Sequence, residues 1–86
     1  MNTQDHQHHI LRTLREAAGH PLLEDVLRSQ AESRIRPRPA RADLDDAIDN
    51  LRSRGFIAVV ANELQPDNPY WILDERGEAY CVKARL

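Results

Sequence analysis

The chain has 86 residues, of which 41% are hydrophobic and 30% charged, with one cysteine and a formal net charge of −2. This length holds one small domain, residues 1–86, and residues 1–7 are expected to form a disordered N-terminus. No apolar run approaches the roughly 18 residues of a membrane helix, and a single cysteine excludes an internal disulfide. The polar start, Met-Asn-Thr-Gln-Asp-His, is unlike a signal peptide, so we expect a cytoplasmic protein without membrane contact.

Charge is distributed unevenly along the chain. Residues 34–41 contain four arginines and no acid, whereas residues 43–78 contain nine acids against three arginines. The dense basic block consists of Arg34, Arg36, Arg38 and Arg41. This local asymmetry is more informative than the small net charge, because it separates a basic segment from an acidic one.

The first half of the chain predicts two helices. Apolar residues recur at helical spacing in residues 4–18, and Gly19 is a typical stop. Pro21 fits the first position of a second helix, which should fade near Ser33. The apolar stripe of that helix consists of Leu22, Leu23, Val26, Leu27 and Ala31. Prolines exclude a helix in residues 34–39, where Ile35 should either start a short strand or pin the loop to the core.

A third helix followed by a strand is predicted in residues 40–61. The helix starts near residue 40, just after Pro39, or at residue 44 with Asp43 as its N-cap and Asp46 facing back. Gly55 stands where a helix end favours a left-handed residue. The apolar face of the helix consists of Leu44, Ala47, Ile48 and Leu51, and the β-branched run 56–61 is typical of a strand.

The end of the chain predicts a second strand and a last helix. The loop 62–69 is rich in turn residues, and residues 70–73 return as the strand. Asp74 caps a helix from Glu75 to about Arg85, with Ala79, Val82 and Leu86 on its apolar side. Cys81 is expected to be buried in this helix as a small hydrophobic residue.

Two segments resemble winged helix-turn-helix regulators of the MarR, PadR and ArsR kind. The pattern Ala-x-x-x-Leu-x-x-x-Gly-Phe-Ile (47–57) is similar to the third helix and first wing strand of that family. Residues 70–79 resemble its Tyr-x-Leu-Thr-x-x-Gly close of the wing, with Asp74 in place of Thr. The resemblance covers residues 8–80. It implies an α+β, mainly α fold with a three-helix core, a two-stranded wing hairpin and a C-terminal helix.

The resemblance also implies a transcriptional regulator whose third helix enters the major groove of double-stranded DNA. Expected phosphate contacts are Arg34, Arg36, Arg38 and Arg41, and expected third-helix and wing contacts are Asn50, Arg52, Asn62 and Gln65. Against this expectation, the third helix carries four carboxylates, which oppose phosphate binding. The arginines can instead pair with these acids, and the wing amides can instead serve as turn residues.

The alternative is a protein-interaction or dimerisation module that does not bind DNA. Its expected interface consists of Asp43, Asp45, Asp46, Asp49 and Trp71. Trp71 is either an exposed interface anchor or a residue covered by the last helix. In both interpretations a homodimer is expected, because a chain this small with few aromatic residues has a thin core.

No catalytic, metal or cofactor site is expected. Asp5, His6, His8 and His9 cluster near the N-terminus, but no two of these histidines are four residues apart, so we interpret the cluster as a polar helix start. The three glycines are isolated, which excludes a glycine-rich phosphate loop. No arrangement of nucleophile and base suggests an enzyme.

Overall fold

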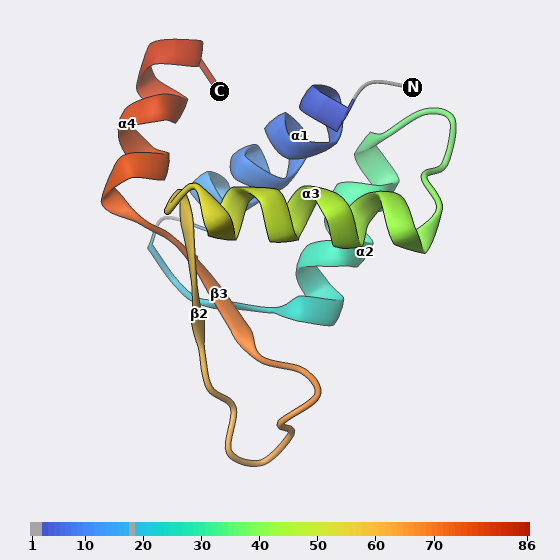
Figure 1. The fold of residues 1–86 in the computed structure, drawn as a ribbon, viewed down its shortest axis with the longest axis vertical. Coiled ribbons are helices and arrows are strands. Elements are labelled where there is room, and N and C mark those ends of the chain that lie inside the picture. Colours follow the sequence, from blue (N-terminus) through green and yellow to red (C-terminus); the bar gives the residue numbers. More distant parts are fainter. Residues whose placement is uncertain (1–2, 18) are drawn as a thin grey trace.

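The computed structural model describes residues 3–17 and 19–86. Over these residues the chain is a small, mainly helical α+β structure with four helices and a three-stranded antiparallel sheet (Figure 1). The elements in chain order are α1 (Thr3–Glu16), β1 (Leu22–Leu23), α2 (Glu24–Arg34), α3 (Arg41–Ser53), β2 (Ile57–Val60), β3 (Tyr70–Leu73) and α4 (Glu75–Ala84). The expected α+β class is confirmed.

Helix α1 is the element that the other helices pack against: α2, α3 and α4 all contact it. Ile10 and Leu11 are completely buried, as the apolar stripe predicts. His6 and Gln7 are also buried within this helix. Residues 3–7 of the expected disordered N-terminus thus lie within α1. Residues 1 and 2, and Ala18 at the end of the predicted helix, lie outside the described residues.

The second helix is shorter than predicted, because its first apolar residues form a strand. Leu22 and Leu23 pair antiparallel with Trp71 and Tyr70 of β3. The N–H of Glu24, the first residue of α2, continues this ladder with a 2.9 Å hydrogen bond to the carbonyl of Pro69. An apolar pair such as Leu22-Leu23 fits either a helix or a strand, and pairing with β3 decides between them.

The loop between α2 and α3 is fixed to the core. Ile35 is 5% exposed and forms no strand, so it pins the loop, the second of its two expected roles. Helix α3 begins at Arg41, after Ala40 as N-cap residue. The carboxylate of Asp43 accepts a 3.0 Å hydrogen bond from the N–H of Ala40. A start near residue 40 is thus confirmed, and Asp43 as N-cap is wrong because it lies inside the first turn.

A glycine turn joins α3 to the hairpin formed by β2 and β3. Gly55 has a φ of +76°, and its N–H donates a 3.0 Å hydrogen bond to the carbonyl of Arg52, as the helix-stop prediction requires. In the hairpin, Ile57 lies opposite Leu73 and Val60 opposite Tyr70. The strand order is β1-β3-β2, and the hairpin loop projects away from the helices (Figure 1).

Helix α4 packs on the core through its smallest side chains. Its N-cap is confirmed, since the Asp74 carboxylate accepts a 2.7 Å hydrogen bond from the N–H of Glu75. Gly77 and Cys81 are buried, as expected for Cys81. The predicted apolar side is confirmed for Leu86, which packs against the core. It is wrong for Ala79, which is exposed, and for Val82, which is 60% exposed, because α4 approaches the β2–β3 hairpin with its Gly77 side.

Candidate interaction surface around helix α3

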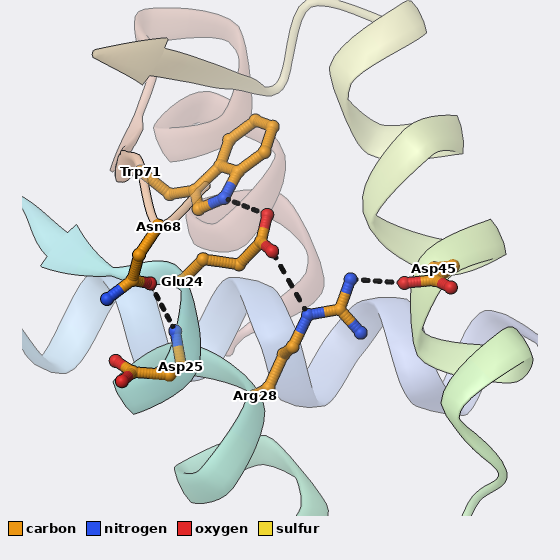
Figure 2. Close-up of polar contacts among 6 residues, drawn as sticks. All are labelled: Glu24, Asp25, Arg28, Asp45, Asn68 and Trp71. Atoms are coloured by element: carbon orange, nitrogen blue, oxygen red, sulfur yellow. Dashed lines mark hydrogen bonds and ion pairs between the residues drawn. The ribbon is translucent and has the colours of Figure 1, made fainter. Parts of the chain in front are cut away.

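Arg28 and Glu24 of α2 together join their helix to α3 and to β3 (Figure 2). Its Nε lies 3.5 Å from Oε2 of Glu24, and its Nη2 forms an ion pair with Asp45 of α3. The other oxygen of Glu24 accepts a 3.1 Å hydrogen bond from the indole N–H of Trp71. The side chains of Arg28 and Glu24 are only 17% and 22% exposed. This polar network therefore fixes the position of α3 relative to α2 and β3.

The loop between β2 and β3, residues 61–69, is attached to the start of α2, and it is called the wing loop after the wing expected from the sequence. Oδ1 of Asn68 accepts a 3.0 Å hydrogen bond from the N–H of Asp25 (Figure 2). Next to Asn68, the carbonyl of Pro69 accepts a hydrogen bond from the N–H of Glu24. Two N–H groups that have no partner within the helix thereby gain acceptors. The end of the loop that precedes β3 is held in place.

Asn62 and Gln65 act as turn residues within the wing loop. Oδ1 of Asn62 accepts hydrogen bonds from the N–H groups of Leu64 and Gln65, at 3.2 and 3.4 Å. Its amide nitrogen donates to the carbonyl of Asn68 at 3.1 Å. Gln65 accepts a hydrogen bond from the amide of Asn68. These amides are engaged in the turn, which is the alternative to their expected role in DNA contact.

Two arginines of the basic block form ion pairs with acids of other helices. Arg34 pairs with Glu16 of α1, and Arg38 pairs with Glu32 of α2. The hydrogen bond from Arg34 lowers the pKa of Glu16 below its ordinary value. The arginines therefore do pair with acids, but these acids belong to α1 and α2, whereas the sequence suggested those of the third helix.

The other two arginines of the block remain available at the surface. Arg36 is exposed, and its side chain donates a 3.2 Å hydrogen bond to the neighbouring carbonyl of Ile35. Arg41, the first residue of α3, is exposed, and its side chain has no ion pair or hydrogen bond with any described residue. Within the described ranges, two of the four arginines are thus unpaired with an acid.

The four aspartates of α3 have three different environments. The carboxylate of Asp43 accepts a hydrogen bond from the N–H of Ala40. Asp45 forms an ion pair with Arg28, and half of its side chain is exposed. Asp46 and Asp49 are exposed, and within residues 3–17 and 19–86 no cation pairs with either of them. Asn50 and Arg52 are exposed on the same helix. The centre of the outward face of α3 is therefore negative.

A groove of about 630 Å³ lies between the starts of α2 and α3 and the wing loop. Its lining includes Glu24, Asp25, Arg28, Arg41, Leu64 and Asp67. Leu64 is 93% exposed at the tip of the loop, which is unusual for a large aliphatic side chain. The groove thus combines an exposed apolar tip with three carboxylates and two guanidinium groups.

The expected role of Trp71 as an exposed anchor is wrong. Its side chain is 5% exposed, and its indole N–H donates a hydrogen bond to the carboxylate of Glu24. Residues Glu24 and Arg28, which hold the network together, were not among the residues expected from the sequence. Their signal is the four-residue spacing of a glutamate and an arginine on one helix, together with a tryptophan whose N–H needs an acceptor when buried.

His6, His8 and His9 of α1 and Cys81 of α4 are each at least partly buried. Nε2 of His8 lies 2.8 Å from the hydroxyl of Tyr80, and His6 is buried. Burial, opposed by Asp5, lowers the pKa of His9 below its ordinary value of 6.5. Burial also raises the pKa of the Cys81 thiol. Among the described residues, no group of three or more His, Cys, Asp or Glu side chains is arranged to hold a metal ion.

No family model, curated protein or solved structure matches this chain. In the described part of the chain, no helix combines the length and the apolar character that crossing a membrane requires.

Proposed function

We propose that this chain is a small winged-helix protein-binding module, in which α3 and the wing loop contact a basic segment of another protein. The order of helices and strands, the β1-β3-β2 sheet and the projecting β2–β3 hairpin support a winged-helix assignment. Winged helices serve both as DNA readers and as protein-interaction domains, so the surface chemistry decides between these functions.

The observation that carries the proposal is the pair of exposed aspartates, Asp46 and Asp49, at the centre of the outward face of α3. The helix that a DNA reader of this class places in the major groove here presents carboxylates. Each of these charges repels phosphate and attracts a lysine or arginine side chain. A basic partner therefore fits this face better than a nucleic acid does.

The groove beside α3 supports the same partner chemistry. Glu24, Asp25 and Asp67 outnumber Arg28 and Arg41 along its lining, and the exposed Leu64 offers an apolar contact at its rim. A segment that alternates cations with an aliphatic side chain matches this surface. Such a segment would pair with Asp46 and Asp49 while covering Leu64.

Fluorescence anisotropy with a labelled arginine- and leucine-rich peptide tests this function. We expect the Asp46→Asn/Asp49→Asn variant to bind about two- to thirtyfold more weakly, because two exposed ion pairs together contribute about 0.4–2 kcal/mol. The matched control is Glu75→Gln/Glu78→Gln, which removes two exposed acids from α4. Equal losses in both variants would show bulk charge attraction only and would reject the proposed surface.

Binding of double-stranded DNA is the second candidate function. Arg36 and Arg41 favour it, because both are exposed beside the start of α3 and neither is paired with an acid of the described residues. The ion pair of Arg38 is also accessible, since its side chain is 82% exposed, and can be exchanged for a phosphate. These arginines and Arg34 are the proposed phosphate contacts. Asn50 and Arg52 would lie nearest the major groove of the DNA.

Duplex DNA binding at low and physiological salt discriminates between the two functions. If DNA is the ligand, Arg36→Ala/Arg41→Ala should weaken binding and reduce the salt slope by about two units, because each lost phosphate contact accounts for about 0.9. Lys83→Ala/Arg85→Ala removes two cations from the other end of the chain and should have no such effect. DNA binding with this pattern, together with no peptide binding, would replace the first candidate by the second.

A further inference from the structure

Strand β2 has an unpaired edge. In the strand order β1-β3-β2 it pairs with β3 on one side, and no strand of residues 3–17 or 19–86 pairs with it on the other. At the opposite side of the sheet, β1 is only two residues long. Because β2 is longer, it provides the more extensive free row of backbone groups in this sheet.

The register shows which backbone groups face outward. The N–H of Asp74 donates a 2.9 Å hydrogen bond to the carbonyl of Phe56, one step beyond the pair Ile57 and Leu73. Hydrogen-bonded and non-hydrogen-bonded pairs alternate in an antiparallel ladder. Ala58 and Val60 therefore direct their backbone groups toward β3, as does the carbonyl of Phe56, whose N–H donates a 3.0 Å hydrogen bond to the carbonyl of Leu51. Ile57 and Val59, and Ala61 beyond the strand, direct theirs away from the sheet.

This edge lacks the features that usually prevent strand association. The sequence of β2 is Ile-Ala-Val-Val, with no charge and no proline. Val59 and Val60 are 44% and 41% exposed. Val60 lies beside Tyr70, which lies beside Leu23 on the next strand, so the apolar surface continues across all three strands. An edge of this composition favours a further strand.

The two ends of β2 carry opposite charges. Arg54 precedes the strand, and the side chain of Arg76 lies over Gly55, with its nearest atoms 3.7 and 3.8 Å from where a Cβ would stand. Glu63 follows the strand. A second β2 in antiparallel orientation brings the cations of each copy to the glutamate of the other, whereas a parallel strand brings like charges together.

We propose that two copies of this chain associate edge to edge through antiparallel pairing of their β2 strands, forming one continuous six-stranded sheet. A two-fold axis at Val59 places Val59 opposite its own counterpart and Ile57 opposite Ala61 of the second copy. In this register Gly55 lies opposite Glu63 of the second copy. The interface is self-complementary, so each ionic contact between Glu63 and the Arg54–Arg76 pair occurs twice.

Analytical ultracentrifugation of the full chain tests the dimer. We expect a reversible equilibrium between the 9.9 kDa monomer and twice this mass. Val59→Lys places a charge on the edge and should raise the dissociation constant at least about tenfold. The matched control is Val82→Lys, the same change at an exposed valine of α4, which should leave the constant unchanged. Circular dichroism verifies that both variants are folded.

Charge reversal tests the register without altering the strand itself. Glu63→Arg, and separately Arg54→Glu/Arg76→Glu, should each weaken self-association, because like charges then meet at both ends. Mixed together, these two variants should form a heterodimer as tight as the wild-type dimer, since opposite charges meet again at both ends.

A chain that stays monomeric up to about millimolar concentration would overturn the proposal. A dimer with the same dissociation constant in the wild type and in Val59→Lys would also overturn it. The same holds if the two charge-reversed variants fail to associate with each other. These readouts measure self-association, which is a different measurement from peptide or DNA binding by α3.

Discussion

Trp71 and Glu24 are joined by a 3.1 Å hydrogen bond although they lie 47 positions apart in the chain. The same carboxylate lies 3.5 Å from Nε of Arg28, which in turn forms an ion pair with Asp45 (Figure 2). One glutamate thus connects the middle strand of the sheet to two helices. Because Glu24 is largely buried, each of its oxygens needs a partner inside the protein.

Replacing Trp71 with phenylalanine should destabilise the protein by about 1–2 kcal/mol. The substitution keeps an aromatic ring in the core but leaves one oxygen of Glu24 without its donor, and an unpaired buried acceptor is costly. Urea unfolding followed by circular dichroism measures the change. Glu24→Gln and the double variant complete a thermodynamic cycle, in which additive effects would show that the hydrogen bond does not contribute.

Gly77→Ala should be more destabilising than Gly19→Ala. A Cβ at Gly77 would lie 2.1 Å from the carbonyl oxygen of Phe56, so α4 and the hairpin would have to separate, at a cost of about 1–3 kcal/mol or more. At Gly19 there is open space, but its φ of +84° disfavours alanine by about 1–2 kcal/mol. Thermal or urea unfolding ranks the two variants, and the reverse order would contradict the tight packing of α4 against Phe56.

Protonation of His9 should destabilise the fold below about pH 6.5. Burial lowers the pKa of His9 in the folded protein, so between that pKa and 6.5 the unfolded chain binds more protons. Stability from this residue is therefore complete above pH 6.5 and decreases as the pH falls toward the folded pKa. Asp5 opposes the shift, while Arg12, Arg34 and His6 reinforce it.

Proton NMR titration of the His9 ring measures this pKa directly. A value at or above 6.5 would contradict the prediction. Urea unfolding at pH 5 and pH 7.5 then tests the consequence, since His9→Gln should reduce the difference in stability between the two pH values.

The thiol of Cys81 should react slowly with a thiol reagent in the native protein. It is completely buried, and burial raises its pKa, so both access and the thiolate fraction are low. Reaction with Ellman's reagent at pH 8 should accelerate as urea unfolds the chain. Rapid stoichiometric labelling without urea would show that α4 opens readily.

Local sequence signals were sufficient to predict most elements. Strand residues 70–73, the Asp74 cap and the Gly55 helix stop depend on neighbouring residues, and each is confirmed. The exception is Leu22–Leu23, predicted as helix and found as β1. Its conformation depends on β3, which is almost 50 residues later, and apolar periodicity carries no information about such a partner.

The candidate surface was harder to predict, because ion pairing depends on how helices pack. The partners of Arg34 and Arg38 are Glu16 and Glu32, and nothing in the spacing of residues 34–41 selects these acids. The burial of Trp71 likewise depends on which sheet face meets the helices. The sequence identifies which residues are charged or aromatic, but their availability to a partner is a property of the tertiary structure.

The attachment of the wing loop to α2 also affects how strongly any partner could bind there. Asn68 accepts a hydrogen bond from the N–H of Asp25 and Pro69 accepts one from that of Glu24, so the end of the loop that precedes β3 is already held in place before a partner arrives. A partner that contacts Leu64 would therefore lose less conformational entropy than one that must immobilise a free loop. Affinity at this tip would then depend partly on Asn68, a residue whose own side chain is turned toward the helix.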